Sequence, residues 1–348
     1  MENTIIEYSR KLDDLEKYVE ELAEINAMLS GNYIEELSKK VQKMNREPSK
    51  RVFDYNLIII TTYGILEGFI EQIIMKYLEE VNDIINEYSN LPKEIKDNHL
   101  ILSAELIINS QKLAKYNDVQ KDDVVRNLWS CIDNESPKYV LNGRAFTHHS
   151  SNFRKDVIRE MFKNIGICNI TSGVTKDDEF KSCVATLKGI ELEDLKGYDE
   201  NSYYIILHDI VERRNDIAHG NDSDDILSLE MLKGYIYYIK QLIRSIYNVL
   251  SKQMKLLQIE NGKTIMLGKP IRVFNNTIIG ISNNFNELKT GMVIFSKNTA
   301  NEEIKVGKIL SIEVNHEKRE SVGKDENIPV GIKVDFKAKD NHEFGVLI

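Results

Sequence analysis

The 348-residue sequence has few of the residues that cross-link or interrupt a fold. It contains three cysteines, none of which forms a Cys-x-x-Cys pair, and five prolines spread along the chain. The cysteine pattern therefore predicts neither a disulfide framework nor a structural zinc site. Because unpaired cysteines are typical of reducing compartments, a cytoplasmic location is expected.

Long apolar runs are also missing. Polar and charged residues interrupt even the most apolar stretch, which begins at residue 57, so no membrane span is expected. The N-terminal residues mix acidic and basic side chains and do not follow the order of a signal peptide. With 42% hydrophobic and 29% charged residues, the composition is typical of a soluble globular protein.

The sequence also lacks an excess of positive charge. The formal net charge of −9 argues against broad affinity for nucleic acids, because phosphate contacts need lysine and arginine. The part after residue 255 is slightly basic, however, and a local nucleic-acid site remains compatible with this distribution.

The hydrophobic pattern changes near residue 255. Before it, apolar residues recur every three or four positions, as in amphipathic helices. After it they alternate, and β-branched residues dominate. We therefore predict an α + β chain of two domains, an all-α helical bundle over residues 1–254 and a small β-barrel over residues 255–348.

The most apolar predicted helix, residues 54–88, is expected at the centre of the bundle because apolar residues surround much of its circumference. Ser150 or Ser151 is expected to cap a later helix, and Trp129 to lie in the core with the tyrosines. The other predicted helices cover residues 4–29, 33–44, 93–113, 118–137, 150–164, 177–187, 201–217 and 226–254.

The second part is predicted to contain short strands at residues 264–267, 271–274, 277–281, 292–295, 303–314, 328–336 and 343–347. Asn275-Asn276 is typical of a hairpin turn between the second and third of these strands. Six or seven short strands in about 90 residues predict a closed barrel.

The strongest chemical signal lies between residues 203 and 220. Leu207, Ile210 and Ile217 mark one face of a helix, and Arg214 falls on the same face, where an apolar residue is expected. Burying an unpaired cation is unfavourable, so Arg214 needs a partner or an anionic ligand. Arg213 points in another direction and is expected in solvent.

His219 follows Arg214 by five positions. On a continuous helix five residues turn by about 500°, which places the two side chains about 140° apart. Gly220 permits a left-handed helix end next to His219. His219 can then leave the helical register and approach Arg214 of its own chain or of a second copy.

The pattern Arg214-Asn215-x-x-x-His219, between an apolar helix and a long closing helix, resembles the active-site motif of the HEPN superfamily. The segment from Thr62 to Glu71 is similar to the central helix of large HEPN proteins of bacterial defence systems. The resemblance covers roughly residues 50–250. It implies a metal-independent endoribonuclease, a toxin or anti-phage effector, that acts on RNA as a homodimer and without a cofactor. An antitoxin or another component of a defence system is a further expected partner.

The residue types suit that chemistry. An arginine at position 214 can bind a phosphate through two hydrogen bonds, and a histidine at position 219 can transfer protons near neutral pH. Asn215 is expected to orient the phosphate or His219. Asp216 is expected to pair with an arginine, and Glu67 with Arg214. A 2′,3′-cyclic phosphate is the expected product.

Other interpretations stay open. Arg214 in a structural ion pair and His219 as a favourable cation at a helix C-terminus would leave a non-catalytic module that binds nucleic acid or protein. A metal site at His148-His149 is not predicted, because adjacent side chains face different directions.

The β part has a weaker resemblance of its own. Leu288-x-x-Gly291-x-x-Ile294, followed by strands and the closing segment from Phe344 to Leu347, is similar to the β-barrel that follows the GTPase domain of translation elongation factors. In that family the barrel contacts tRNA or the ribosome. A packing or oligomerisation barrel is the alternative, because a shared fold does not by itself imply a shared function.

Overall fold

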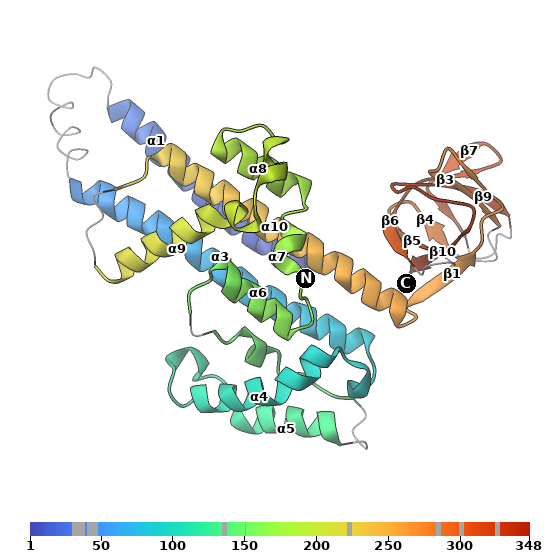
Figure 1. The fold of residues 1–348 in the computed structure, drawn as a ribbon, viewed down its shortest axis with the longest axis horizontal. Coiled ribbons are helices and arrows are strands. Elements are labelled where there is room, and N and C mark those ends of the chain that lie inside the picture. Colours follow the sequence, from blue (N-terminus) through green and yellow to red (C-terminus); the bar gives the residue numbers. More distant parts are fainter. Residues whose placement is uncertain are drawn as a thin grey trace. The chain divides into compact units, whose positions relative to one another are not determined.

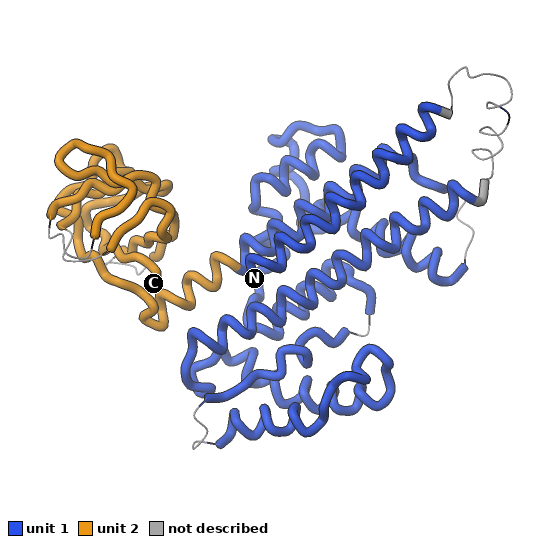
Figure 2. The backbone as a smooth tube through the Cα atoms, turned by 180° about the vertical axis from the view of Figure 1, so that it is seen from behind, with its two compact units in different colours: residues 1–250 blue, residues 251–348 orange. Residues whose placement is uncertain are grey.

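The computed structural model describes residues 1–29, 39, 48–133, 138–149, 151–220, 225–282, 287–298, 303–323 and 328–348. The chain divides into two compact units, residues 1–250 and residues 251–348 (Figure 2). The first is helical and the second is built from antiparallel strands, so the predicted α + β class is confirmed. The helix predicted at residues 33–44 lies outside the described residues except for Lys39.

Long helices form the frame of the first unit (Figure 1). They are α1 (Glu2–Leu29), α3 (Pro48–Ile84) and α10 (Leu229–Glu260), whose end from Ser251 onward belongs to the second unit. Ion pairs show how α1 and α10 are aligned: Lys240 pairs with Asp13, and Lys233 pairs with Glu20 at 3.0 Å. Because the later residue of α10 meets the earlier residue of α1, the two helices run antiparallel.

The predicted central helix corresponds to α3. This helix is long and apolar enough to cross a membrane by length and composition, with a mean hydropathy of 1.5, but 56% of its apolar window is buried inside the unit. A core helix has this composition because it is covered on several sides. The fully covered positions of α3 include Ile58, Leu66, Phe69, Ile70, Ile73 and Ile74.

Shorter helices cover the frame. They are α4 (Lys93–Asn109), α5 (Lys121–Ile132), α6 (Lys155–Asn164), α7 (Ile170–Val174), α8 (Asp178–Lys188) and α9 (Ile205–Ala218), with short 3-10 turns at Tyr88–Asn90 (η1), Ala114–Tyr116 (η2), Gly143–Thr147 (η3), Asp194–Gly197 (η4) and Glu200–Tyr204 (η5). The serine cap expected for α6 is wrong for Ser151, since Arg154 is the N-cap residue; Ser150 lies outside the described residues.

Trp129 is not a core residue, although the sequence predicted that it would be. It is 63% exposed, and Val125 and Ile132 on the same face of α5 are exposed as well. Helix α5 instead buries Val124. Periodicity shows that a helix has an apolar stripe, but the elements packed against the helix determine which side is covered. Most tyrosines of the long helices are buried as expected, for example Tyr63 and Tyr77.

The second unit is one antiparallel ladder in the order β1-β10-β5-β6-β9-β3-β2, with β7 on β6 and a separate β4-β8 pair. The strands are β1 (Thr264–Gly268), β2 (Arg272–Phe274), β3 (Ile278–Ser282), β4 (Leu288–Lys289), β5 (Val293–Asn298), β6 (Ile304–Val314), β7 (Glu317–Arg319), β8 (Ser321–Val322), β9 (Pro329–Val334) and β10 (His342–Leu347). Within the described residues the ladder ends at β1 and β2, so the predicted closure into a barrel is wrong. Strand number and alternation predict a sheet, but they do not determine whether its two edges meet.

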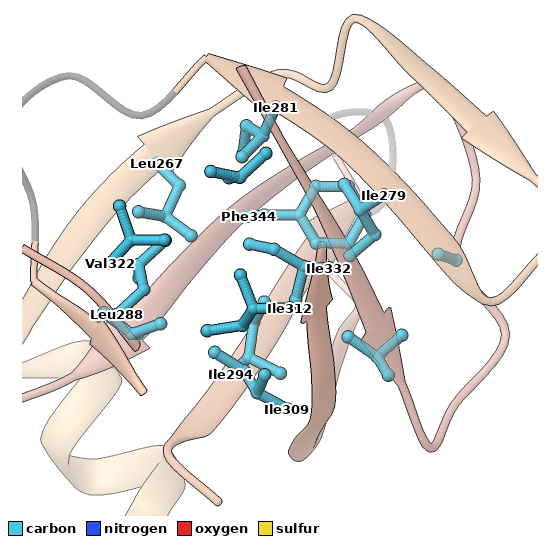
Figure 3. Packing of buried hydrophobic residues seen from close by; sticks show 14 of the residues in the cluster. Leu267, Ile279, Ile281, Leu288, Ile294, Ile309, Ile312, Val322, Ile332 and Phe344 are labelled. Atoms are coloured by element: carbon cyan, nitrogen blue, oxygen red, sulfur yellow. The ribbon is translucent and has the colours of Figure 1, made fainter. Parts of the chain in front are cut away.

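The long strand β6 joins the two halves of this ladder. Its first residues pair with β5, its later residues pair with β9, and a bulge lies between Ile309 and Ser311. The bend directs both halves toward one core of isoleucine, valine and phenylalanine (Figure 3). The hairpin turn predicted between β2 and β3 is confirmed, because Asn275 and Asn276 have φ values of +50° and +56°.

Candidate active site around Arg214

Helix α9 carries the Arg-Asn-x-x-x-His motif and packs against α3 (Figure 1). Leu207, Ile210 and Val211 are buried, whereas Arg214 and Ile217 are half-buried. Arg214 therefore lies on the apolar face of α9, as predicted, but at the position where that face is no longer fully buried. Its side chain is partly accessible to solvent.

Neutral groups hold Arg214. Its Nη1 donates to Oδ1 of Asn152 and to Oδ1 of Asn215, both at 3.4 Å. Its guanidinium carbon lies 5.0 Å from the centre of the Tyr63 ring. A cation over an aromatic face gains roughly 0.5–2 kcal/mol from the ring quadrupole. None of these contacts supplies a negative charge, so they do not neutralise Arg214.

The groups around Arg214 also bind one another. Asn152 donates through Nδ2 to Oδ1 of Asn215 at 2.8 Å, and the Tyr63 hydroxyl donates to Oδ1 of Asn152 at 3.4 Å. The backbone N–H of Phe153 donates to the Tyr63 hydroxyl at 3.2 Å. Burial raises the pKa of Tyr63, so this phenol stays protonated near neutral pH. The result is a connected polar network of neutral groups below the guanidinium.

Arg213 has the opposite environment, which corrects the expectation that it lies in solvent. Only 13% of its side chain is exposed. It donates to Asp209 at 2.6 Å, to the hydroxyl of Tyr55 at 3.0 Å and to the Asp225 carboxylate at 2.9 Å. Helical periodicity gave its direction correctly, but Tyr55 on α3 and Asp225 after the motif cover that direction. Arg213 is therefore a structural arginine that ties Asp225 to α9.

His219 lies at the end of α9, where the sequence predicted a helix end because Gly220 follows. It is the C-cap residue of α9, its side chain is exposed, and its backbone N–H still donates to the Asn215 carbonyl at 2.9 Å. Gly220 adopts a left-handed φ of +70°. Among the described residues no hydrogen bond joins His219 to Arg214 of the same copy. The motif thus presents an exposed imidazole, and Asp216 beside it is exposed too.

Glu67 does not pair with Arg214, contrary to the expectation from the sequence. The imidazole of His149 lies between two carboxylates of α3, with Nε2 at 3.3 Å from Glu67 and 3.2 Å from Glu71. Lys115 pairs with Glu71 and lies 3.9 Å from Glu67. The segment after η3 and the region around Lys115 cover this part of α3. The sequence of α3 itself does not indicate that these two segments pack there.

His149 is charged near neutral pH. Burial of the ring opposes the charge, but hydrogen bonds with Glu67 and Glu71 outweigh it and raise the pKa of His149 to about 9. The other ring nitrogen, Nδ1, donates to the carbonyl of Ser151 at 2.8 Å. The ring also packs edge-on against Phe153, with centroids 4.2 Å apart. His149 therefore anchors the segment that carries Asn152 to the site.

Glu67, Glu71 and His149 are residue types that bind divalent cations, and their ligand atoms lie within 4.8 Å of one another. In this structure the imidazolium and Lys115 balance the two carboxylates, so the group forms a closed set of ion pairs. His148 has separate partners, since its ring nitrogens contact Asn109 and Tyr116 at 3.1 Å.

The helical unit and its motif can now be compared with known families. Residues 13–252 match the family model described as RiboL-PSP-HEPN. Because the match covers well over half of the chain, the protein belongs to this HEPN family. The matched range contains the Arg214–His219 motif and the charged cluster at His149, and it ends before the first strand of the second unit. A comparison with curated proteins finds no match.

Proposed function

We propose that this HEPN protein is a metal-independent endoribonuclease. One observation carries the proposal: of two adjacent arginines, Arg213 is neutralised by carboxylates, whereas the described contacts of Arg214 are all with neutral groups. The carboxylate pairing of Arg213 is typical of a structural arginine. An arginine that is half-exposed and hydrogen-bonded to amides rather than to carboxylates suits the binding of a phosphodiester. His219, exposed five residues later, is the proton-transfer group of the same site.

The proposed reaction is an internal transesterification. Arg214 donates hydrogen bonds to the non-bridging oxygens of the scissile phosphate and stabilises the charge that develops on them. A histidine takes the proton of the ribose 2′-hydroxyl, whose oxygen attacks the phosphorus. The P–O5′ bond breaks, and the leaving 5′-oxygen receives a proton from a second, protonated histidine. The products are a 2′,3′-cyclic phosphate and a 5′-hydroxyl, with Asn215 orienting the Arg214 guanidinium.

One histidine cannot act as base and acid at the same moment, and this is our reason for proposing a homodimer with two Arg214–His219 pairs at one cleft. An exposed apolar stripe on α3 supports the dimer. Phe53, Leu57 and Ile60 are 71%, 51% and 46% exposed, and their spacing of four and three residues places them on one face of α3. Residues of this kind are depleted from free surfaces and enriched in interfaces.

The test is RNA cleavage in EDTA with tRNA and mRNA as substrates. Wild-type protein is expected to leave 2′,3′-cyclic phosphate ends. His219→Ala is expected to slow cleavage by about 10²–10⁴-fold, the usual contribution of a general acid or base. His208→Ala is a matched control, because His208 is also an exposed histidine of α9, and it should cleave at the wild-type rate. Cleavage by His219→Ala at the wild-type rate would overturn the proposal.

The dimer is tested separately with Leu57→Glu. A charge in the middle of the apolar stripe is expected to shift the protein to a monomer in analytical ultracentrifugation and to slow cleavage in parallel. A monomeric variant that cleaves as fast as wild type would show that one copy is sufficient.

The proposed biological setting is that of a toxin or an anti-phage effector, with an antitoxin or another defence component as partner. Expression of the wild-type protein in bacteria is then expected to arrest growth. The His219→Ala variant should relieve the arrest at equal protein level, and an arrest that persists would contradict this setting.

A further inference from the structure

His149 and residues 151–154 reach the candidate site from outside both α3 and α9. This stretch lies between η3 and α6, and a side chain at each of its ends forms an ion pair. At its start, His149 lies between two carboxylates of α3. At its end, Arg154 pairs with Glu212 of α9. Phe153, next to Arg154, is fully buried. We call His149 together with residues 151–154 the clamp segment, because these residues contact both helices that form the site.

Asn152 is the residue of the clamp segment that touches the motif. Its Oδ1 accepts from Nη1 of Arg214 and from the hydroxyl of Tyr63, and its Nδ2 donates to Asn215. One side chain thereby contacts both polar residues at the start of the motif and the ring on which the guanidinium lies. The arginine has several rotatable bonds, and these contacts restrict it to one direction.

An amide side chain can make all three of these contacts without neutralising Arg214. A carboxylate at position 152 would accept from Arg214 but would neutralise it and repel Oδ1 of Asn215. A lysine would donate to Asn215 but could not accept from Arg214 or Tyr63. An amide accepts on one side, donates on the other and leaves the charge of Arg214 available to a ligand.

We infer that Asn152 is a positioning residue of the ribonuclease site, which holds Arg214 toward the scissile phosphate while leaving its charge uncompensated. This inference rests on the proposed function. Asn152 does not touch the reacting atoms; it acts through Arg214. The clamp segment delivers it, and the ion pairs at His149 and Arg154 give the segment a fixed position on both helices.

The experiment measures two quantities for each variant: the cleavage rate with RNA, and the affinity for a 2′-O-methyl oligonucleotide of the same sequence, which cannot be cleaved. Charge-assisted hydrogen bonds contribute enough that Arg214→Ala is expected to weaken this affinity about tenfold or more. Asn152→Ala is expected to weaken it by a smaller factor and to lower the cleavage rate. In the background of Arg214→Ala, the second substitution Asn152→Ala should change neither quantity further.

Asn152→Asp separates positioning from space filling. It has nearly the same shape as asparagine, so a merely structural role predicts little change in RNA affinity. Positioning without neutralisation predicts that Asn152→Asp binds the oligonucleotide more weakly than Asn152→Ala. Asn201→Ala, at another asparagine of the helical unit, serves as the control and should behave as wild type. Melting temperatures establish that each variant is folded under the assay conditions.

The outcomes are distinct. Loss of affinity with Asn152→Ala, a larger loss with Asn152→Asp and no added effect beside Arg214→Ala support the inference. Wild-type affinity and rate for Asn152→Ala, or effects that add to those of Arg214→Ala, overturn it while the proposed function stands. If Arg214→Ala binds and cleaves as wild type does, the proposed function falls and the inference falls with it.

Discussion

The charged cluster at His149 allows a quantitative prediction about stability and pH. The perturbation is His149→Gln, which removes the imidazolium between Glu67 and Glu71 and keeps a polar side chain. The pKa of His149 is raised from 6.5 to about 9 in the folded protein. A change of one unit in pKa corresponds to about 1.4 kcal/mol. Protonation of His149 therefore stabilises the folded state by about 3 kcal/mol.

The sign follows from the direction of this change. Because the folded protein holds the proton more tightly than the unfolded chain, the stabilisation is fully present below about pH 6.5 and is lost as the pH rises through about 9. The free energy of unfolding of wild type minus that of His149→Gln should therefore fall by about 3 kcal/mol between pH 6 and pH 10. The titration of other groups is common to both proteins and cancels in the difference.

Urea denaturation followed by circular dichroism at 222 nm measures this difference, because the helical unit dominates that signal. His148→Gln is the matched control. Burial lowers the pKa of His148, so this neighbour is neutral above pH 7 and its replacement should give a difference that does not change toward high pH. If the His149→Gln difference is equally flat, the imidazolium is not held between the carboxylates and the reasoning is refuted.

Other substitutions test the structural assignments. Arg213→Ala should reduce the free energy of unfolding by about 2–3 kcal/mol, since Asp209 loses a charged hydrogen bond, and an unchanged melting temperature would contradict this. Gly345→Ala would place a Cβ 2.5 Å from the ring of Phe295 and 3.0 Å from the carbonyl oxygen of Ile265. It should destabilise the second unit by about 1–3 kcal/mol, measured by hydrogen exchange of its strand amides; wild-type protection would show that the site has room. EDTA should leave RNA cleavage unchanged, and a loss that Zn²⁺ reverses would show that the carboxylates at His149 bind a metal.

Much of the local structure could be predicted from the sequence because it depends on neighbours along the chain. The strand ranges were close to those observed, since alternation and turn residues act within a few positions. Asn275 and Asn276 tolerate left-handed conformations, and Gly220 ends the motif helix for the same reason. Arg214 could be recognised as unusual from helical periodicity alone.

The contacts around the motif could not be predicted in this way. Glu67 lies one turn after Tyr63 on α3, yet Arg214 stacks on Tyr63 whereas His149 binds Glu67. Which of these α3 side chains contacts Arg214 and which contacts His149 depends on where the clamp segment crosses α3. Asn152 was missed altogether, because it lies outside the motif, more than 60 residues before Arg214. A polar residue between two anchored neighbours has no distinctive pattern in the sequence.

By itself the sequence determined the order of the long helices and the longer strands, the change of fold type near residue 255 and the segment that carries Arg214 and His219. These follow from periodicity and backbone preferences, which act over a few residues. Only the tertiary structure decided that Arg213 pairs with carboxylates, whereas the contacts of Arg214 among the described residues are with neutral groups. The two residues are adjacent and chemically identical, so what distinguishes them is the set of distant groups that folding brings to each: carboxylates to one, amides and an aromatic ring to the other.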